Sequence, residues 1–171
     1  MYAREYNKLY KPKNKRKCMV VFIQYILTVL IAYSGLIAGT IISYAATEEL
    51  KPGKLFFTIT KNGLIALIIA IILTKFHIAI PIIAAFAIFT FLHFVPTKIR
   101  WIYISSAIFL GLTAKNNALL IIQAIQIFLL GTIYVALEYK EKDSLKINLR
   151  RIVKETYPFL IIAIVLFFLP F

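Results

Sequence analysis

Acidic residues are scarce in this chain of 171 residues, and none lies inside its long apolar stretches. The seven acids fall outside those stretches or at their ends: Glu5, Glu48, Glu49, Glu138, Glu141, Asp143 and Glu155. Carboxylates inside membrane segments are the usual means of coupling protons or cations to transport. Their absence argues against carboxylate-coupled transport and against intramembrane aspartyl chemistry.

Cysteine and histidine are rarer still. Cys18 is the single cysteine, so the chain cannot form an internal disulfide. His77 and His93 are the only histidines, and on one helix they would lie about 24 Å apart, too far to share a metal ion. The sequence contains no Gly-rich phosphate loop and no Gly-x-Ser-x-Gly motif. We therefore expect no catalytic centre, no metal site and no cofactor, and an enzyme is the less favoured class.

Apolar residues, by contrast, make up 61% of the chain, and the mean hydropathy is +0.86. Soluble domains contain about 45–50% apolar residues, and a soluble chain of this length has too little interior to hide the excess. Lipid must therefore cover it. Because ionised groups are costly at the bilayer centre, their position at the ends of the apolar runs supports the same conclusion. The sequence predicts an all-α, polytopic helical membrane protein.

Positive charge is concentrated in two places, and the formal net charge is +13. Seven of the twenty Lys and Arg residues lie in the first seventeen positions, and six lie between Lys140 and Lys154. Both clusters border apolar stretches, so we expect anionic lipid headgroups as their partner and not nucleic acid. Residues 1–18 are predicted to be a basic cytoplasmic arm without regular structure away from the membrane, and residues 19–171 a single membrane-embedded helical domain.

Six apolar segments are predicted to be membrane helices. They are Met19–Ala46, Leu55–Lys75, Ile78–Val95, Lys98–Thr113, Ala118–Leu137 and Tyr157–Phe171. Thr47–Lys54 is expected to be a loop because Pro52 and Gly53 interrupt helices. Lys61, close to a predicted membrane boundary, is expected to reach the headgroups as an anchor. Residues 138–156 form a charged connector between the last two segments.

The distribution of Lys and Arg leaves the number of crossings open. If all six segments cross and the N-terminus is cytoplasmic, nine cations lie inside and eleven outside, against the positive-inside rule. If Lys98–Thr113 enters and returns on the same side, fourteen lie inside and six outside. If Ile78–Val95 is the segment that does not cross, the counts are sixteen and four. Charge therefore favours five crossings, whereas hydropathy favours six.

Gly35, Gly39 and Ser43 recur at intervals of four in the first segment. Small residues on one ridge let two helices approach closely, which matters because lipid provides no hydrophobic drive for helices to associate. The ridge is predicted to be a helix-packing face. Packing within the chain is favoured over dimerisation because the first helix has many neighbours in its own chain.

Asn116, Gln123 and Gln126 are spaced so that they share one face of the fifth segment. Two carboxamides inside an apolar run would be unsatisfied against lipid, so this face must point to protein or water. One hypothesis is a polar strip that lines a solute path. The other, which we favour, is hydrogen bonding between helices.

The stretch Ser144–Thr156 has the pattern of a short amphipathic interfacial helix. Its apolar stripe consists of Leu145, Leu149, Ile152 and Val153. Its cations are candidate contacts for anionic lipid: Lys146, Arg150, Arg151 and Lys154. Such a helix can lie in the membrane plane with its apolar face in the acyl region. Binding to a partner subunit is the alternative use.

Taken together, these patterns predict a multi-pass protein of the cell membrane with its N-terminus in the cytoplasm. The absence of catalytic motifs, together with the small-residue and basic faces, favours an accessory or scaffolding subunit of a larger membrane assembly. The alternative is a small-solute transporter or substrate-binding component that uses the polar face of the fifth segment. It differs in requiring that face to line a cavity.

Overall fold

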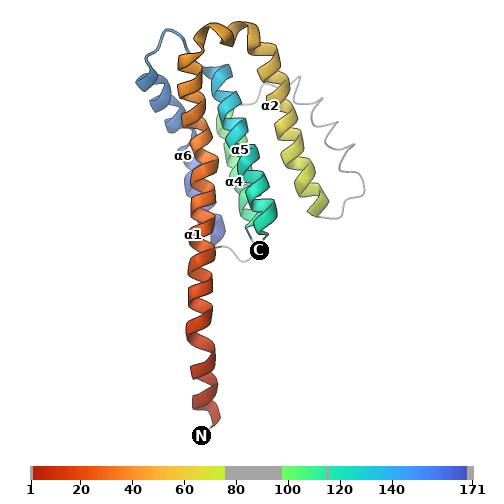
Figure 1. Ribbon diagram of the computed structural model, residues 1–171, viewed down its shortest axis with the longest axis vertical. Helices are drawn as coiled ribbons and strands as arrows, with labels where there is room; N and C mark the ends of the chain where they lie inside the picture. Colours follow the sequence, from red (N-terminus) through yellow and green to blue (C-terminus); the bar gives the residue numbers. More distant parts are fainter. Residues whose placement is uncertain (1, 76–97, 115, 169–171) are drawn as a thin grey trace.

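The structure is a computed structural model that describes residues 2–75, 98–114 and 116–168. Within these residues the chain is helical, without strands. The helices are α1 (Tyr2–Ala45), α2 (Thr47–Lys75), α4 (Ile99–Thr113), α5 (Asn117–Glu138) and α6 (Leu145–Phe167). Figure 1 shows them as a bundle from which the N-terminal part of α1 projects.

Three of the described helices are long and apolar enough to cross a membrane: Met19–Ala45, Thr47–Ile71 and Asn117–Glu138. This finding supports the prediction of a helical membrane protein. The predicted count of six membrane helices is not confirmed. The predicted segment Ile78–Val95 lies outside the described residues, and α4 has only 15 residues, about 22 Å of helix against a hydrocarbon core of about 30 Å.

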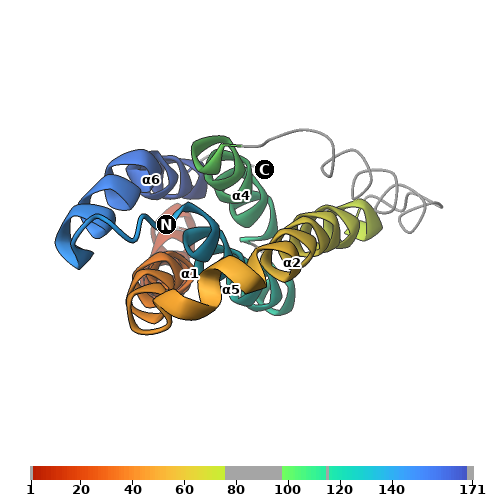
Figure 2. The ribbon, with the colours of Figure 1, turned by 90° about the horizontal axis from the view of Figure 1, so that it is seen from above.

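The helix α5 is the central element of the described bundle. It contacts α1, α2 and α4, whereas α6 packs against α1 and α4 (Figure 2). Gly35 and Gly39 of α1 lie against Phe128 and Thr132 of α5, so these two helices run parallel. The hydroxyl of Tyr25 donates a hydrogen bond of 2.9 Å to the carbonyl of Ala163, which places the start of the α1 span beside the end of α6.

The order of these contacts places the N-terminal arm and the charged connector at opposite ends of the bundle (Figure 1). Lys51, near the start of α2, forms an ion pair of 3.1 Å with Glu141 of the connector. At the far end, Gly111 of α4 packs against Leu166 of α6. The helix α4 therefore runs from the connector end towards the arm end, and the number of segments that cross a membrane stays a prediction.

The predicted loop Thr47–Lys54 is also wrong, because these residues form the beginning of α2. Only Ala46 separates α1 from α2, and its N–H donates to the carbonyl of Ile42 at 2.9 Å. Glu48 and Glu49 occupy the first turn, where carboxylates interact favourably with the helix dipole. Pro52 lies inside α2, and the helix bends in this region without ending (Figure 1).

The predicted separation of a short interfacial helix from a last apolar segment is wrong as well. Ser144–Thr156 and Tyr157–Phe171 contribute to one continuous helix, α6, which passes through Pro158. A proline removes one backbone donor, and membrane helices tolerate this where neighbouring groups compensate. Thr156 and Phe159, on either side of Pro158, are fully buried, so residues on both sides of the proline pack into the core.

The arm also differs from expectation, since residues 2–18 are part of α1. The helix continues through Pro12, a residue that commonly interrupts helices. The core of the bundle contains three aromatic residues at the contact of α1, α4 and α6. The ring of Phe159 lies 6.0 Å from that of Tyr33 and 5.4 Å from that of Tyr103.

Candidate functional sites

The small-residue ridge of α1 lies against α5. A Cβ atom added at Gly35 would collide with the backbone carbonyl of Phe128, and one added at Gly39 would lie 2.7 Å from the Cα of Thr132. The hydroxyl of Thr132 lies 3.2 Å from the carbonyl of Gly35, across the two helices, and 3.1 Å from the carbonyl of Phe128 in its own helix, so the two carbonyls compete for its one proton. Ser43 is 1% exposed. Gly35 and Gly39 thus serve contact within this chain, the alternative that the sequence favoured over dimerisation.

A third glycine, Gly131 of α5, lies at the same contact between α1 and α5. A Cβ atom at this position would collide with the Tyr103 hydroxyl and lie 3.1 Å from the backbone nitrogen of Leu36. The helices α1, α4 and α5 therefore meet at the Cα atom of Gly131. The sequence analysis did not single out Gly131, although a lone glycine inside an apolar helix often marks such a close approach.

The three polar residues predicted to share one face of α5 divide into two groups. Asn116 is exposed and caps the N-terminus of α5, where its side-chain oxygen accepts from the N–H of Leu119 at 3.2 Å. Gln123 and Gln126 are 0% and 6% exposed and lie inside the bundle. The capping geometry accounts for Asn116, because Asn is a preferred residue at this position.

The hydrogen bonds of the two glutamines are few. The Thr113 hydroxyl lies 3.4 Å from Oε1 of Gln123, but it also lies 3.0 Å and 3.1 Å from backbone carbonyls of its own helix. Because a hydroxyl has one proton, the bond between the helices is weak. Nε2 of Gln123 and Oε1 of Gln126 have no hydrogen-bond partner among the described residues. Neither glutamine lines either of the two cavities described below.

Closer to the connector end of α5, Lys61 and Asn62 of α2 lie against the bundle. Lys61 is half-buried, and its Nζ lies 5.6 Å from the centre of the Tyr134 ring. Asn62 is 1% exposed, and both polar atoms of its amide lack a hydrogen-bond partner among the described residues. The lysine is therefore held over an aromatic face, an arrangement that attracts a cation.

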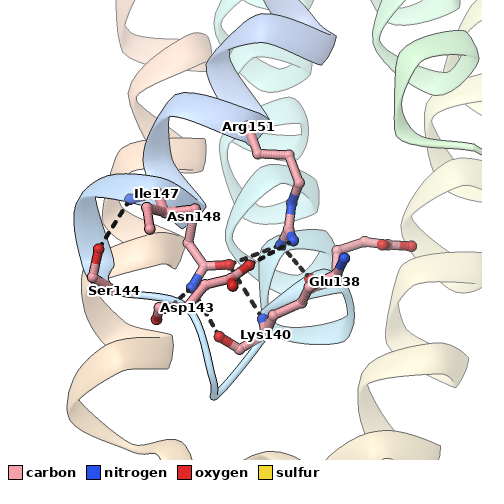
Figure 3. A network of polar contacts seen from close by, with 7 residues as sticks. All are labelled: Glu138, Lys140, Asp143, Ser144, Ile147, Asn148 and Arg151. Carbon is pink, nitrogen blue, oxygen red and sulfur yellow. Dashed lines mark hydrogen bonds and ion pairs between the residues drawn. The ribbon is translucent and has the colours of Figure 1, made fainter.

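The connector between α5 and α6 is a compact hydrogen-bonded turn (Figure 3). Asn148 organises it: Nδ2 donates to the carbonyls of Lys140 at 3.0 Å and Asp143 at 3.2 Å, while Oδ1 accepts from the Lys140 N–H at 3.2 Å. Ser144 caps α6 by accepting from the N–H of Ile147 at 3.4 Å. Asn148 is fully buried, so one side chain satisfies backbone groups that would otherwise be unpaired.

Arg151 belongs to this turn, and this separates it from the other three cations predicted to contact lipid. Its guanidinium donates to Asp143 at 3.2 Å, to the Glu138 carbonyl at 2.9 Å and to Oδ1 of Asn148 at 2.8 Å (Figure 3). Lys146, Arg150 and Lys154 are exposed on α6. Arg151 is thus fixed by the protein, whereas for the other three, which are exposed, contact with headgroups stays a prediction.

A basic cavity of about 520 Å³ lies between the start of α4 and α6. Its lining consists of Arg100, Arg151, Lys154, Glu155, Tyr157 and Pro158. Sequence reasoning missed Arg100, which lies far along the chain from the α6 cations. A second cavity, about 230 Å³ and mainly apolar, lies among α2, α4 and α5 and includes Ile68, Trp101 and Leu130 in its lining.

Among the residues that the structure describes, no group of three or more His, Cys, Asp or Glu side chains is placed to hold a metal ion. His77 and His93 lie outside the described residues. Searches against protein-family models, curated proteins and solved structures found no match to this chain.

Proposed function

We propose that this protein is an accessory or scaffolding subunit of a larger membrane assembly, without catalytic activity of its own. The observation that supports this proposal is the position of α2 at the edge of the described bundle (Figure 2). Only 17% of its most apolar stretch is buried, against 50% for α5. Large apolar side chains are exposed along α2: Leu55, Phe56, Ile59 and Leu67.

This surface is suited to a second membrane protein because helices associate in lipid through close packing and a few polar contacts. The same helix contains Gly63, where a Cβ atom would have nothing within 4 Å. A small residue beside exposed large ones gives a contoured surface into which side chains of another helix can fit. Lipid is the competing occupant, and it would leave no defined partner.

Photo-crosslinking in native membranes tests the proposal. A photoreactive amino acid at Ile59, which is 45% exposed on α2, should give one protein adduct of discrete mass. The matched control is Ile161 of α6, which is 55% exposed and should give only lipid adducts. Lipid adducts alone at both positions would overturn the proposal.

We further propose that the protein resides in the cell membrane with its N-terminus in the cytoplasm. Seven cations directly precede the first span, and the first helix usually sets the orientation of a membrane protein. Because the structure has the arm and the connector at opposite ends of the bundle, the connector then lies on the other side. Its exposed cations Lys146, Arg150 and Lys154 are placed to meet anionic headgroups there.

A further inference from the structure

We propose that the basic cavity between α4 and α6 binds the phosphate group of an anionic phospholipid. The cavity has a volume of about 520 Å³, enough for a headgroup phosphate and part of its glycerol. It combines Arg100, at the start of α4, with Arg151 and Lys154 of α6. Lys146 and Arg150 do not line it. The proposal requires only that the chain lies in a membrane, and it does not depend on a role as a subunit.

The charges in the cavity match a phosphodiester. Within the described residues, Arg100 and Lys154 form no ion pair, whereas Arg151 is paired with Asp143 at 3.2 Å. Glu155 also lines the cavity. The three cations are counted against two acids: Asp143 offsets Arg151, and the charge of Glu155 offsets that of one other cation without forming an ion pair. One net positive charge remains. A phosphodiester with one negative charge neutralises it, whereas Glu155 repels the second charge of a phosphomonoester.

The cavity is also preorganised. The guanidinium of Arg151 is held by Asp143, Asn148 and the Glu138 carbonyl, so this cation does not need to be ordered when a ligand binds. Side chains fixed before binding reduce the entropic cost of association. Arginine also presents its donors in a planar fork that matches phosphate oxygens.

An apolar surface that continues from the cavity indicates a lipid and not free phosphate. Tyr157 lines the cavity and is 52% exposed. Ile161, Ile164 and Val165 follow it along the same side of α6, and all three are exposed. A phosphate bound between Arg100 and Lys154 would place its acyl chains along this stripe. Tyrosine at this boundary is typical of the membrane–water interface.

The experiment is a titration of the full-length protein in mild detergent with short-chain phosphatidylglycerol, followed by native mass spectrometry to count bound lipid. The double variant Arg100→Gln, Lys154→Gln should bind at least about tenfold more weakly, because two charge-assisted contacts are lost. The matched control, Lys54→Gln with Lys142→Gln, makes the same change of charge at exposed positions outside the cavity. Its affinity should stay within about twofold. Equal weakening by both double variants, or none by the first, would overturn the proposal.

Two further arms separate the ligand sources and guard against misfolding. Inorganic phosphate at millimolar concentration should not compete with the lipid; competition as effective as that of unlabelled lipid would show a site for free phosphate and overturn the lipid assignment. Glu155→Gln removes a negative charge from the lining and should bind the lipid more tightly. A variant that is merely destabilised would not gain affinity, so weaker binding by Glu155→Gln contradicts the electrostatic argument.

Discussion

At the scale of single residues, the distance between α1 and α5 is set by the absence of side chains. Gly35 lies directly over the carbonyl of Phe128, and a Cβ atom added at Gly131 would lie 3.1 Å from the backbone nitrogen of Leu36, closer than ordinary van der Waals contact. Since apolar burial does not drive helices together in lipid, the energy of this crossing comes mainly from packing, because the Thr132 hydroxyl shares its one proton between the carbonyls of Gly35 and Phe128. Even one methyl group at such a crossing changes the packing.

We therefore expect Gly35→Ala to destabilise the protein by about 1–3 kcal/mol, because the obstructing atoms belong to the backbone of α5 and cannot rotate away. Thermal unfolding in mild detergent measures the effect. The control is Gly63→Ala, at a helical position where a new Cβ atom meets nothing within 4 Å. This second variant should be more stable by about 0.5–1 kcal/mol, because alanine loses less backbone entropy. Similar unfolding temperatures for both would contradict the described crossing.

Gln123 offers a second prediction at this scale. Its carboxamide is buried, and its single contact with Thr113 is long at 3.4 Å. Replacing it with methionine keeps the length of the side chain and removes an amide nitrogen that has no partner in the described bundle. We expect Gln123→Met to change the free energy of unfolding by less than about 1 kcal/mol. A loss above about 2 kcal/mol would mean that the carboxamide makes hydrogen bonds that stabilise the fold more than its long contact with Thr113 does.

The sequence predicted part of this residue-level picture. Spacing alone identified Gly35 and Gly39 as a packing ridge, since small residues four apart share a helix face in any fold. It could not identify Tyr103 and Phe128 as the groups that fill the space, because contact between distant segments is not encoded in a local period. Asn116 was grouped with the glutamines by its spacing, but the helix begins one residue later and makes it a cap.

At the scale of elements, the turn between α5 and α6 depends on one buried side chain. Asn148 makes bonds with Lys140, Asp143 and Arg151, so its amide connects the end of α5 to the first turn of α6. The cap at Ser144 contributes one bond of 3.4 Å. The geometry of the connector therefore depends far more on Asn148 than on the cap.

Asn148→Ala should cost about 2–3 kcal/mol, because several backbone and side-chain partners lose their bonds in a buried position. Ser144→Ala, which removes only the cap, should cost about 1 kcal/mol or less. Denaturant unfolding in the same detergent compares the two variants. If Asn148→Ala were no more costly than Ser144→Ala, the connector would not have the network shown in Figure 3.

Element boundaries were harder to predict than element type. Pro52 and Gly53 predicted an interruption, yet α2 continues through both positions, and α6 likewise continues through Pro158. Residue type indicates how much free energy a helix loses at that position. Whether the helix continues also depends on packing, and the residues on both sides of Pro158 are buried. The amphipathic pattern of Ser144–Thr156 correctly indicated a helix, but pattern alone could not show that it joins the next apolar segment.

At the scale of the whole molecule, charge and geometry favour different topologies. Lys and Arg counts favoured five crossings because they gather the arm and the connector on one side. The bundle has these two segments at opposite ends, since α1 is parallel to α5 and the connector follows α5 directly. The six acids outside the arm lie in the first turn of α2 or in and beside the connector, so they lower the net positive charge at the connector end of the bundle. With six crossings, nine cations lie on the cytoplasmic side and eleven on the other side. The cation count therefore does not fix the orientation, and a direct measurement of sidedness is needed.

Because Cys18 is the only cysteine, sidedness can be measured with single introduced thiols. In a Cys18→Ser background, Lys142→Cys marks the connector and Lys8→Cys marks the arm. In intact cells, a maleimide that cannot cross the bilayer should label position 142, and it should label position 8 only after the membrane is permeabilised. This outcome follows from the opposite placement of the two segments together with the seven cations that favour a cytoplasmic arm. Labelling of both positions only after permeabilisation would restore five crossings, because the connector would then share the cytoplasm with the arm. The reverse pattern, with position 8 labelled first, would keep the bundle and invert its orientation, and it would show that the eleven cations at the connector end outweigh the arm.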